Sequence, residues 1–531
     1  MKKKRNKLSP SSASSRTGLR GAVATKQSGE IKMNIPLLAL GFLLMLTTVS
    51  CNKWLDVRPS NQFDKEEQFQ TTQGYIDVLV GAYQSMNEEA TYGAELSFRF
   101  IDVLAQLYGN KSNTATDYYG LSARYAYTEV NDTQHSPKTV IENLWTKQYN
   151  SIAQLNYLLK HLDTRPAELS ESDYRLIKGE ALALRGFLHF DLLRLFAPAY
   201  SEATANENAI PYVTEFTVSP SDVLTIAEIV ERIETDMLAG IALQEDTQDI
   251  DQIASNQGTT ALGAELFYMF RQNRMNYWAA KALLARMYLY AGDKGNAKKY
   301  ADEVIDSGWF HFSLISGRNY DERDVRSNII FTSEHVFSLH HSRLKNVADD
   351  FFKTNALDPE EVDLFNTQSV LDGIYESTVE GLESDIRSSA ASPSRWSPHS
   401  NSVVYSKKYY ADHSTNVTQR LIPLIRLPEM YYIAAESAET VEEAREYLNA
   451  VRTARNIVTL FTAENLPDQA TLQEKLFKEY RKEYYAEGQL WYFYKRFGYT
   501  SLQNTVYYGN MNAAYTLPIP DAELEFNPDY Q

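Results

Sequence analysis

Apolar residues recur along most of the chain at spacings of three and four, which is the pattern of a helix with one buried face. The clearest examples run from Ile141 to Leu162 and from Tyr174 to Leu195, and the second stops before Pro198, where a helix should end. Segments of the same period follow at 222–243, 276–291, 294–307, 427–437, 441–455 and 470–495. The pattern therefore predicts a mainly α-helical protein.

Two regions predict pairs of helices joined by a short turn. In 276–307 an apolar segment leads to Gly292 and Asp293, which favour a turn, and a second apolar segment follows. Met430–Arg455 repeats this arrangement. Small residues at the expected crossings are typical of tetratricopeptide-like hairpins: Ala282, Ala297, Ala301, Ala434, Ala435 and Ala444. One pair cannot bury both of its apolar faces, so several pairs must stack.

The segments between the helices are long and rich in tyrosine. They include 108–130, 310–345 and 356–420, and they hold short β-like runs at Ile329–Phe331 and His335–Leu339. Loops longer than about 12–15 residues are uncommon unless they are functional or disordered, and the tyrosines argue against disorder. The fold class predicted is mainly α, with tetratricopeptide-like helix pairs and long, partly β loops packed in one globular body.

The N-terminal segment is predicted to be a secretory signal. Basic residues precede an uncharged apolar run, Ile35–Leu46, which is shorter than the roughly 20 residues that a spanning helix needs. Small residues then lead to Cys51, the one cysteine of the chain. This resembles the lipobox of bacterial lipoproteins, although Thr48 stands where Leu is commoner. We therefore expect residues 1–50 to be a signal peptide and Cys51 to carry lipid, with plain cleavage, a retained anchor and a start at Met33 left open.

Charge and cysteine content exclude several classes of function. Of the 52 Lys and Arg and 69 Asp and Glu, nine bases and one acid lie in residues 1–50, so residues 51–531 carry a net charge of −25. So acidic a body repels phosphate backbones, and no nucleic-acid partner is expected. A single cysteine leaves no disulfide, thiolate metal site or redox pair.

Four segments follow one another in an order that resembles the SusD/RagB family, the nutrient-binding surface lipoproteins of Bacteroidetes. They are CNKWLDVRP at Cys51–Pro59, the helix Gly179–Phe196, the stretch Ile422–Arg452, and Tyr480–Gly498 with its YRKE, EGQLW and KRFG motifs. Ala197 stands where the family usually has Gly. The segments span essentially the mature chain, and their combination is specific to this family.

The resemblance implies a helical body that caps a SusC-like TonB-dependent transporter and delivers glycans, or in some members peptides. It implies an N-terminal SusD-like region at 51–250 and a C-terminal SusD/RagB region at 251–531, both in one body. It also implies lipid anchoring in the outer membrane with the protein facing the exterior. No enzymatic activity, cofactor or metal is expected.

Catalytic carboxylates would be the main alternative for a glycan-binding chain. A glycoside hydrolase needs two carboxyl groups roughly 5–10 Å apart across a cleft, one with a raised pKa. Glu479, Glu483 and Glu487 share a helical spacing, but basic residues lie among them, and we interpret them as a salt-bridged helix surface. Metal ligation is not predicted either: the nine histidines form no HExxH motif, His340 and His341 should point to opposite faces of a strand, and Asp363–Glu376 lacks the spacing of a calcium loop.

Aromatic side chains are the candidates for ligand binding, because sugar rings stack on Trp and Tyr. Trp145, Trp278 and Trp491 lie on helix faces and are expected in the core. The candidates in polar loops are Tyr118, Tyr119, Tyr320 and Trp396, with loop packing or a transporter interface as the alternative role.

The leading prediction is capture of an extracellular nutrient, an oligosaccharide, for a transporter. A peptide-binding protein of the same fold is the alternative within the binding class. A surface glycoside hydrolase and a helical-repeat scaffold are the alternatives from other classes.

Overall fold

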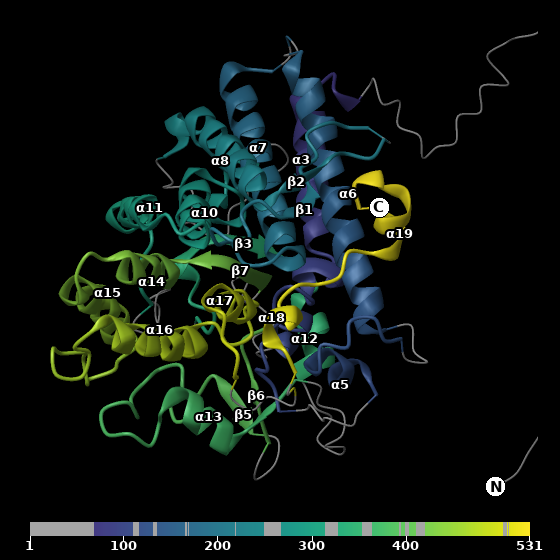
Figure 1. Ribbon diagram of the computed structural model, residues 1–531. Helices are drawn as coiled ribbons and strands as arrows, with labels where there is room; N and C mark the ends of the chain where they lie inside the picture. Colours follow the sequence, from purple (N-terminus) through teal and green to yellow (C-terminus); the bar gives the residue numbers. More distant parts are fainter. Residues whose placement is uncertain are drawn as a thin grey trace, which may run out of the picture. The chain divides into compact units, whose positions relative to one another are not determined.

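Helices account for most of the secondary structure of the protein, as the periodicity predicts (Figure 1). The computed structural model describes residues 68–109, 116–130, 135–164, 167, 169–217, 219–248, 267–313, 328–352, 364–391, 394–398, 403–409, 420–502, 507 and 509–530. The predicted mainly α fold is confirmed. None of the helices in these ranges combines the length and the apolar character that a membrane span requires.

The first helices pack one on the next in chain order. They are α3 (Thr72–Met86), α6 (Pro137–Asp163), α7 (Glu171–Phe196) and α8 (Ile226–Leu243), with α3 on α6, α6 on α7 and α7 on α8. Shorter elements lie between them: η1 (Glu89–Gly93), α4 (Phe100–Leu104), α5 (Tyr118–Ala123), and η2 (Glu245–Thr247) after α8. Ser136 and Ser170 cap the starts of α6 and α7, and Thr225 and Glu228 form a capping box at α8.

The stack continues through the two predicted helix pairs. α10 (Tyr277–Tyr290) packs on α11 (Lys294–Asp306), α11 on α14 (Leu427–Ser437), and α14 on α15 (Val441–Ala454). The alanines predicted at the crossings are all fully buried. Both pairs are confirmed, and α16 (Gln469–Glu483) packs on α14 and α15 beyond them. The prediction that Trp145, Trp278 and Trp491 lie in the core is also confirmed, since all three side chains are buried.

The predicted helix at 470–495 is two helices, α16 and α17 (Leu490–Phe497). Residues between them leave the helical conformation, and Ala486 and Gly488 take positive φ angles of 59° and 70°. A left-handed backbone cannot continue a right-handed helix, so the prediction of one helix was wrong. Spacing alone did not reveal the break, because apolar residues resume at a helical interval after Gly488.

The described residues form three small antiparallel sheets among the helices. β1 (Asn208–Pro211) pairs with β2 (Val223–Thr225), and β3 (His335–His340) pairs with β7 (Leu421–Arg426). β6 (Val403–Ser406) lies between β4 (Asn366–Thr367) and β5 (Trp396–Pro398). The strand predicted at His335–Leu339 is confirmed. Ile329–Phe331 is not a strand, because Phe331 takes a φ of +58° and leads into the short helix η4 (Thr332–Glu334).

The remaining short elements are η3 (Arg271–Asn273), α12 (Leu344–Phe352), α13 (Gln368–Tyr375), α18 (Met511–Ala514), α19 (Asp521–Phe526) and η7 (Pro528–Tyr530). The C-terminal segment returns to the first half of the chain, and α19 lies beside α6 in Figure 1. Lys138 of α6 pairs with Asp521, Asn527 donates to the carbonyl of Ser221, and Tyr530 donates to that of Ala209. Asn527 and Tyr530 therefore hold the C-terminal segment against β1 and the residues before β2, and Asp521 holds it against α6.

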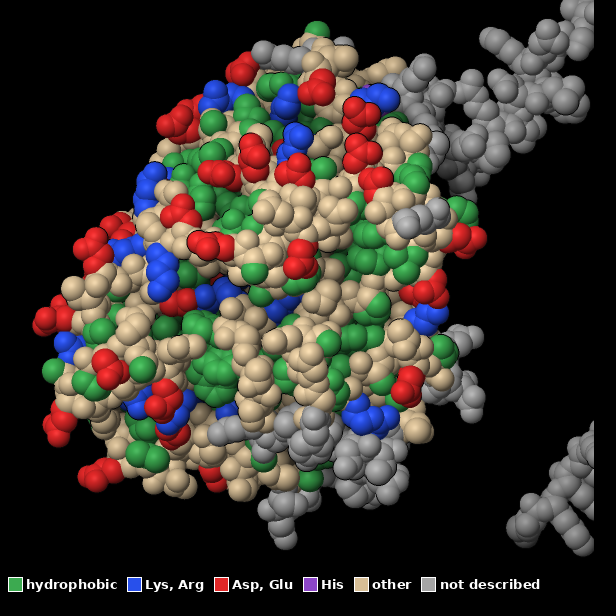
Figure 2. Space-filling model, viewed as in Figure 1, with side chains coloured by type: hydrophobic (Ala, Val, Ile, Leu, Met, Phe, Trp, Pro, Cys, Tyr) green, Lys and Arg blue, Asp and Glu red, His purple; other side chains and the backbone are tan. Residues whose placement is uncertain are grey.

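Residues Asp64–Gln531 form one compact unit. Cys51, the predicted signal peptide and the predicted boundary between residues 250 and 251 lie outside the described residues, so these remain predictions. Asp and Glu side chains are spread over the face of the molecule in Figure 2 and do not gather in a single patch.

Candidate functional site

Two of the aromatic residues predicted to bind ligand, Tyr118 and Tyr119, begin helix α5. Tyr118 is buried, and its hydroxyl donates to Glu95 Oε2 at 2.7 Å. Tyr119 is partly exposed, and its ring packs edge-on against that of Tyr118 with 5.0 Å between centroids. The expectation that both tyrosines lie in a loop was wrong, because both belong to α5, and a buried carboxylate takes the hydroxyl of Tyr118 inward. Tyr320 lies outside the described residues.

Arg99 organises the surroundings of these two tyrosines. Its Nη1 donates to Glu95 Oε1 at 2.9 Å, and its Nε donates to the Tyr119 hydroxyl at 3.2 Å. The guanidinium also lies 4.8 Å from the centre of the Tyr118 ring and 4.3 Å from that of Phe351. We call Arg99, Glu95, Tyr118 and Tyr119 the Arg99 cluster.

The electrostatics of the Arg99 cluster keep its geometry fixed. Burial raises the pKa of Glu95, but the charge of Arg99 and the hydrogen bond from His135 outweigh it and lower the pKa below its ordinary value. Glu95 is therefore ionised at neutral pH and anchors Arg99. The result is a partly exposed aromatic ring beside a held guanidinium, a combination that suits the apolar face and the hydroxyls of a sugar.

Trp396, the third described candidate, is a core residue of a different region. It begins β5 and is only 4% exposed. Its indole Nε1 donates to the carbonyl of Arg387 at 2.9 Å, and its ring packs edge-on against Tyr375 and Tyr485. The expectation that Trp396 lies in a polar loop was wrong, because it belongs to β5, which pairs with β6 in a small sheet.

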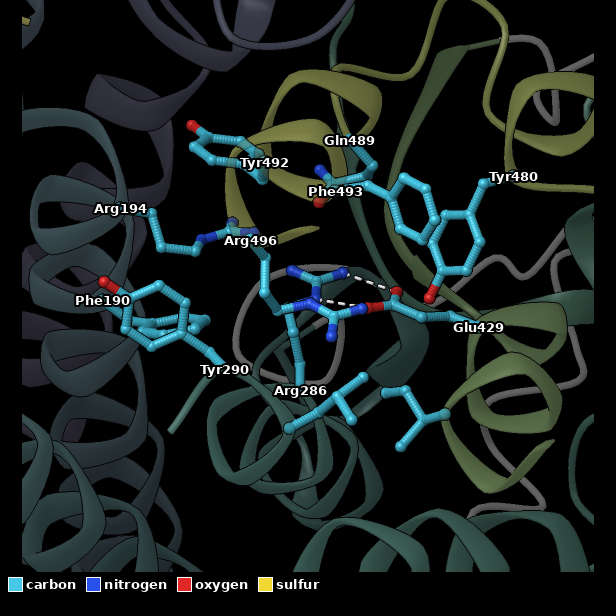
Figure 3. Close-up of a pocket in the computed structure, with 12 residues that line it drawn as sticks. Phe190, Arg194, Arg286, Tyr290, Glu429, Tyr480, Gln489, Tyr492, Phe493 and Arg496 are labelled. Carbon is cyan, nitrogen blue, oxygen red and sulfur yellow. Dashed lines mark hydrogen bonds and ion pairs between the residues drawn. The ribbon is translucent and has the colours of Figure 1, made fainter. Parts of the chain in front are cut away.

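A polar cavity lies where α7, α10, α14, α16 and α17 meet, and we call it the central cavity (Figure 3). Three arginines line it, Arg194 of α7, Arg286 of α10 and Arg496 of α17. The rings of Tyr492, Phe190 and Tyr290 lie around them. Its lining consists of Phe190, Arg194, Arg286, Leu289, Tyr290, Glu429, Ile433, Tyr480, Gln489, Tyr492, Phe493 and Arg496.

Each arginine of the central cavity has its own carboxylate. Arg286 donates from Nε and Nη2 to the two oxygens of Glu429 at 2.5 and 2.7 Å. Arg496 holds Glu436 in the same bidentate way, and Arg194 pairs with Asp191. The cavity volume of about 50 Å³ holds roughly three or four water molecules. We therefore interpret it as a hydrated polar junction between helices, and not as a sugar-sized pocket.

The acidic residues that the sequence offered as catalytic candidates are buried. Glu479 and Glu483 end α16, Glu487 follows it, and all three are at most 4% exposed. Ion pairing was predicted correctly, but their position on the helix surface was not. They belong to a set of mutually paired buried charges, which we call the buried charge network: Glu334, Asp385, Arg387, Lys408, Arg426, Arg452, Arg455, Glu479, Lys482, Glu483 and Glu487.

Glu483 stands at the centre of this network. Its carboxylate accepts hydrogen bonds from Arg387, Arg426 and Arg455 at 2.7–2.9 Å. Burial raises the pKa of Glu483, but the three guanidiniums hold it well below its ordinary value. Burial likewise opposes the effect of Lys482, Arg387 and Arg452 on Glu479, whose pKa is about 2. A catalytic acid needs a raised pKa, so these carboxylates are suited to holding arginines and not to donating protons.

The predicted histidine arrangement is confirmed in one respect. His340 is exposed and His341 is buried, as expected for neighbours on opposite faces of a strand end. Within the described ranges, no group of three or more His, Cys, Asp or Glu side chains has the arrangement of a metal site.

Sequence and structure comparisons place the chain among known proteins. Residues 53–289 match a SusD-like family described as "Starch-binding associating with outer membrane", and residues 374–531 match the SusD family proper, SusD/RagB. The chain belongs to the SusD/RagB family. A search of curated protein sequences found no match.

Solved structures share the fold. A SusD superfamily protein from Bacteroides thetaiotaomicron is 21% identical with a TM-score of 0.62, over 87% of this chain and 99% of that one. A putative sugar binding protein from Bacteroides vulgatus is 22% identical with a TM-score of 0.61, over 86% and 97%. A laminarin binding SusD-like protein is 18% identical with a TM-score of 0.54, over 84% and 98%. The predicted SusD-like fold is thereby confirmed.

Proposed function

We propose that this protein binds an extracellular oligosaccharide without altering it and passes it to a TonB-dependent transporter in the outer membrane. The observation that carries the proposal is Tyr119, a partly exposed ring held by hydrogen bonding to Arg99. Its family and the laminarin binding of one structural relative support a glycan as the ligand. The low pKa of the paired Glu479 and Glu483 favours binding over hydrolysis at those residues.

Sugar binding at the Arg99 cluster should depend on the ring of Tyr119. Calorimetry of residues 52–531 against a panel of neutral oligosaccharides should find at least one ligand, and Tyr119→Ala should weaken its binding by about tenfold, since an aromatic contact contributes roughly 0.5–1.5 kcal/mol. Tyr300→Ala is the matched control, because Tyr300 is a partly exposed tyrosine on α11. An equal loss of affinity in both variants would contradict the assignment of Tyr119 to the binding site. Formation of a cleaved product would favour the hydrolase alternative.

The anchoring and the transporter partner can be tested together. The native protein, extracted from its own membranes in mild detergent, should co-purify with a TonB-dependent β-barrel, and a Cys51→Ser variant should leave the membrane fraction because it lacks the residue that carries lipid. Several acyl chains give stable anchoring where one does not, so partial release would indicate incomplete lipidation. Recovery of the protein alone, or only with soluble enzymes, would contradict the transporter role and favour the scaffold or hydrolase alternatives.

A further inference from the structure

A second, smaller cavity lies beside β5 and β6, and we call it the Trp396 cavity. Its walls include the rings of Phe331, Tyr375, Trp396 and Tyr485, and Arg395 lines it as well. Its volume of about 30 Å³ holds roughly two or three water molecules, which is too little for a sugar ring but enough for one small polar group.

Arg395 differs from the other arginines around it. Its side chain is more than nine-tenths buried, and its Nε and Nη1 donate to the carbonyls of Ile386 and Ile329. The guanidinium lies 3.8 Å from the centre of the Phe331 ring. Its Nη2 is buried without a hydrogen-bond partner among the residues that the structure describes. A guanidinium donor left open in this way costs free energy, since water no longer satisfies it.

The neighbouring arginines of the buried charge network all have carboxylates. Arg387 pairs with Asp385, Arg426 with Glu487, and Arg455 with Glu334. No carboxylate of the described residues lies within ion-pair distance of Arg395. Burial and the charge of Arg455 lower the pKa of Arg395 to about 9, so at pH 7 it still carries its charge. The Trp396 cavity is thus lined by an arginine that has one open N–H donor and no carboxylate partner among the described residues.

We propose that the Trp396 cavity binds the carboxylate of an acidic sugar residue, a uronate, within the oligosaccharide ligand. A planar carboxylate matches the geometry of a guanidinium edge and would fill the open donor of Arg395. The cavity admits a group of that size, and the ring of the sugar would remain outside it. Glu483 also lines the cavity, but its carboxylate is already held by three guanidiniums, those of Arg387, Arg426 and Arg455.

This inference rests on the proposed function, since it specifies the kind of glycan. Lys408, another lining residue, supports the anionic character of the ligand. Its Nζ donates to the carbonyl of Tyr485 and to Glu487, which leaves one of its three N–H groups for a further acceptor.

The test compares D-glucuronate, neutral D-glucuronamide and D-glucose by calorimetry on residues 52–531. We expect glucuronate to bind at least tenfold more tightly than glucuronamide, and this comparison needs no variant that could misfold. In Arg395→Gln the preference should vanish, and in Arg395→Lys it should be retained in part. Arg445→Gln, at a partly exposed position on α15, is the control and should keep the preference in full. Equal binding of glucuronate and glucuronamide to the wild-type protein would overturn the inference.

Two further outcomes separate the inference from the proposal on which it rests. If neutral oligosaccharides bind in a way that depends on Tyr119 but a uronate brings no gain, the inference fails and the proposed function stands. If glucuronate binds through Arg395 but no oligosaccharide binds, the proposed function fails. Acetate binding as tightly as glucuronate would overturn the assignment to a sugar, because the site would then accept any small carboxylate.

Discussion

Glu483→Gln should destabilise the protein by about 3–5 kcal/mol at pH 7, the range found when one partner of a buried ion pair is removed. The amide keeps the shape of the side chain but removes the charge that three buried arginines share, Arg387, Arg426 and Arg455. None of these guanidiniums can lose its proton at neutral pH, so each becomes a less well compensated buried charge. Chemical denaturation of residues 52–531, followed by tryptophan fluorescence, would measure the change.

The same variant should also alter the dependence of stability on pH. Folding lowers the pKa values of Glu479 and Glu483. Their contribution to the free energy of unfolding is therefore complete above about pH 4.5 and is lost as pH falls. For Glu479 the loss extends down to about pH 2. Wild-type protein should therefore lose stability steeply below pH 4.5. Glu483→Gln should lose less, because one of the two contributions is already absent, and the two stability curves should converge in acid.

Glu446→Gln provides the matched control for this comparison. Glu446 is an exposed acid on α15, and neutralising a surface charge changes stability by at most about 0.5 kcal/mol. If Glu483→Gln behaved like Glu446→Gln at pH 7, the buried charge network would contribute nothing to folding. The arginines would then have to be compensated by groups other than Glu483.

The helices could be predicted from sequence because their information is local. A helical face needs apolar residues at intervals of three and four, and both the long helices α6 and α7 and the two alanine-rich pairs follow that rule closely. The break between α16 and α17 was missed because it depends on the backbone of Ala486 and Gly488, while the apolar spacing continues through it. The spacing of apolar residues does not report the backbone conformation of a single residue.

The buried charge network could not be predicted, because its pairs join distant parts of the chain. Glu483 is preceded by Arg481 and Lys482, which suggested pairing along one helix, yet its partners Arg426 and Arg387 lie 57 and 96 residues away in sequence. Nothing in a helix pattern shows that acidic positions face inward. The one available indication was the density of charged residues in Tyr480–Gly498, which the family resemblance, and not the spacing, identified as important.

The candidate site was predicted in part for a related reason. Tyr119 is partly exposed, but Tyr118 and Trp396 are buried by contacts with Glu95 and with Arg387, which belong to other segments. Arg99 and Arg395 were missed because an arginine near a loop is ordinary in sequence. Their roles follow from what surrounds them: Arg99 has a buried carboxylate partner, and Arg395 has none among the described residues.

The Arg99 cluster is connected to the buried charge network through Gly488. A Cβ at Gly488 would lie 2.2 Å from the carbonyl oxygen of Leu96 and 2.8 Å from that of Ser97, in the segment that leads into Arg99. On the other side, Gly488 directly follows Glu487, which accepts from Arg426. Arg99, which donates to the Tyr119 hydroxyl, is therefore positioned by backbone packed against the break between α16 and α17.

Gly488→Ala should accordingly cost about 3 kcal/mol or more and weaken oligosaccharide binding. The φ of +70° alone costs roughly 1–2 kcal/mol for a residue with a Cβ, and the contact with the Leu96 carbonyl must be relieved by moving backbone. Gly498→Ala isolates the first effect, the cost of the positive φ, since Gly498 has a similar φ of +64° with nothing within 4 Å of the added Cβ. We expect Gly498→Ala to show only the smaller loss of stability and unchanged binding. Equal losses of stability in the two variants would mean that the approach of Leu96 to Gly488 is not tight, and unchanged binding in Gly488→Ala would mean that this approach does not position the Arg99 cluster.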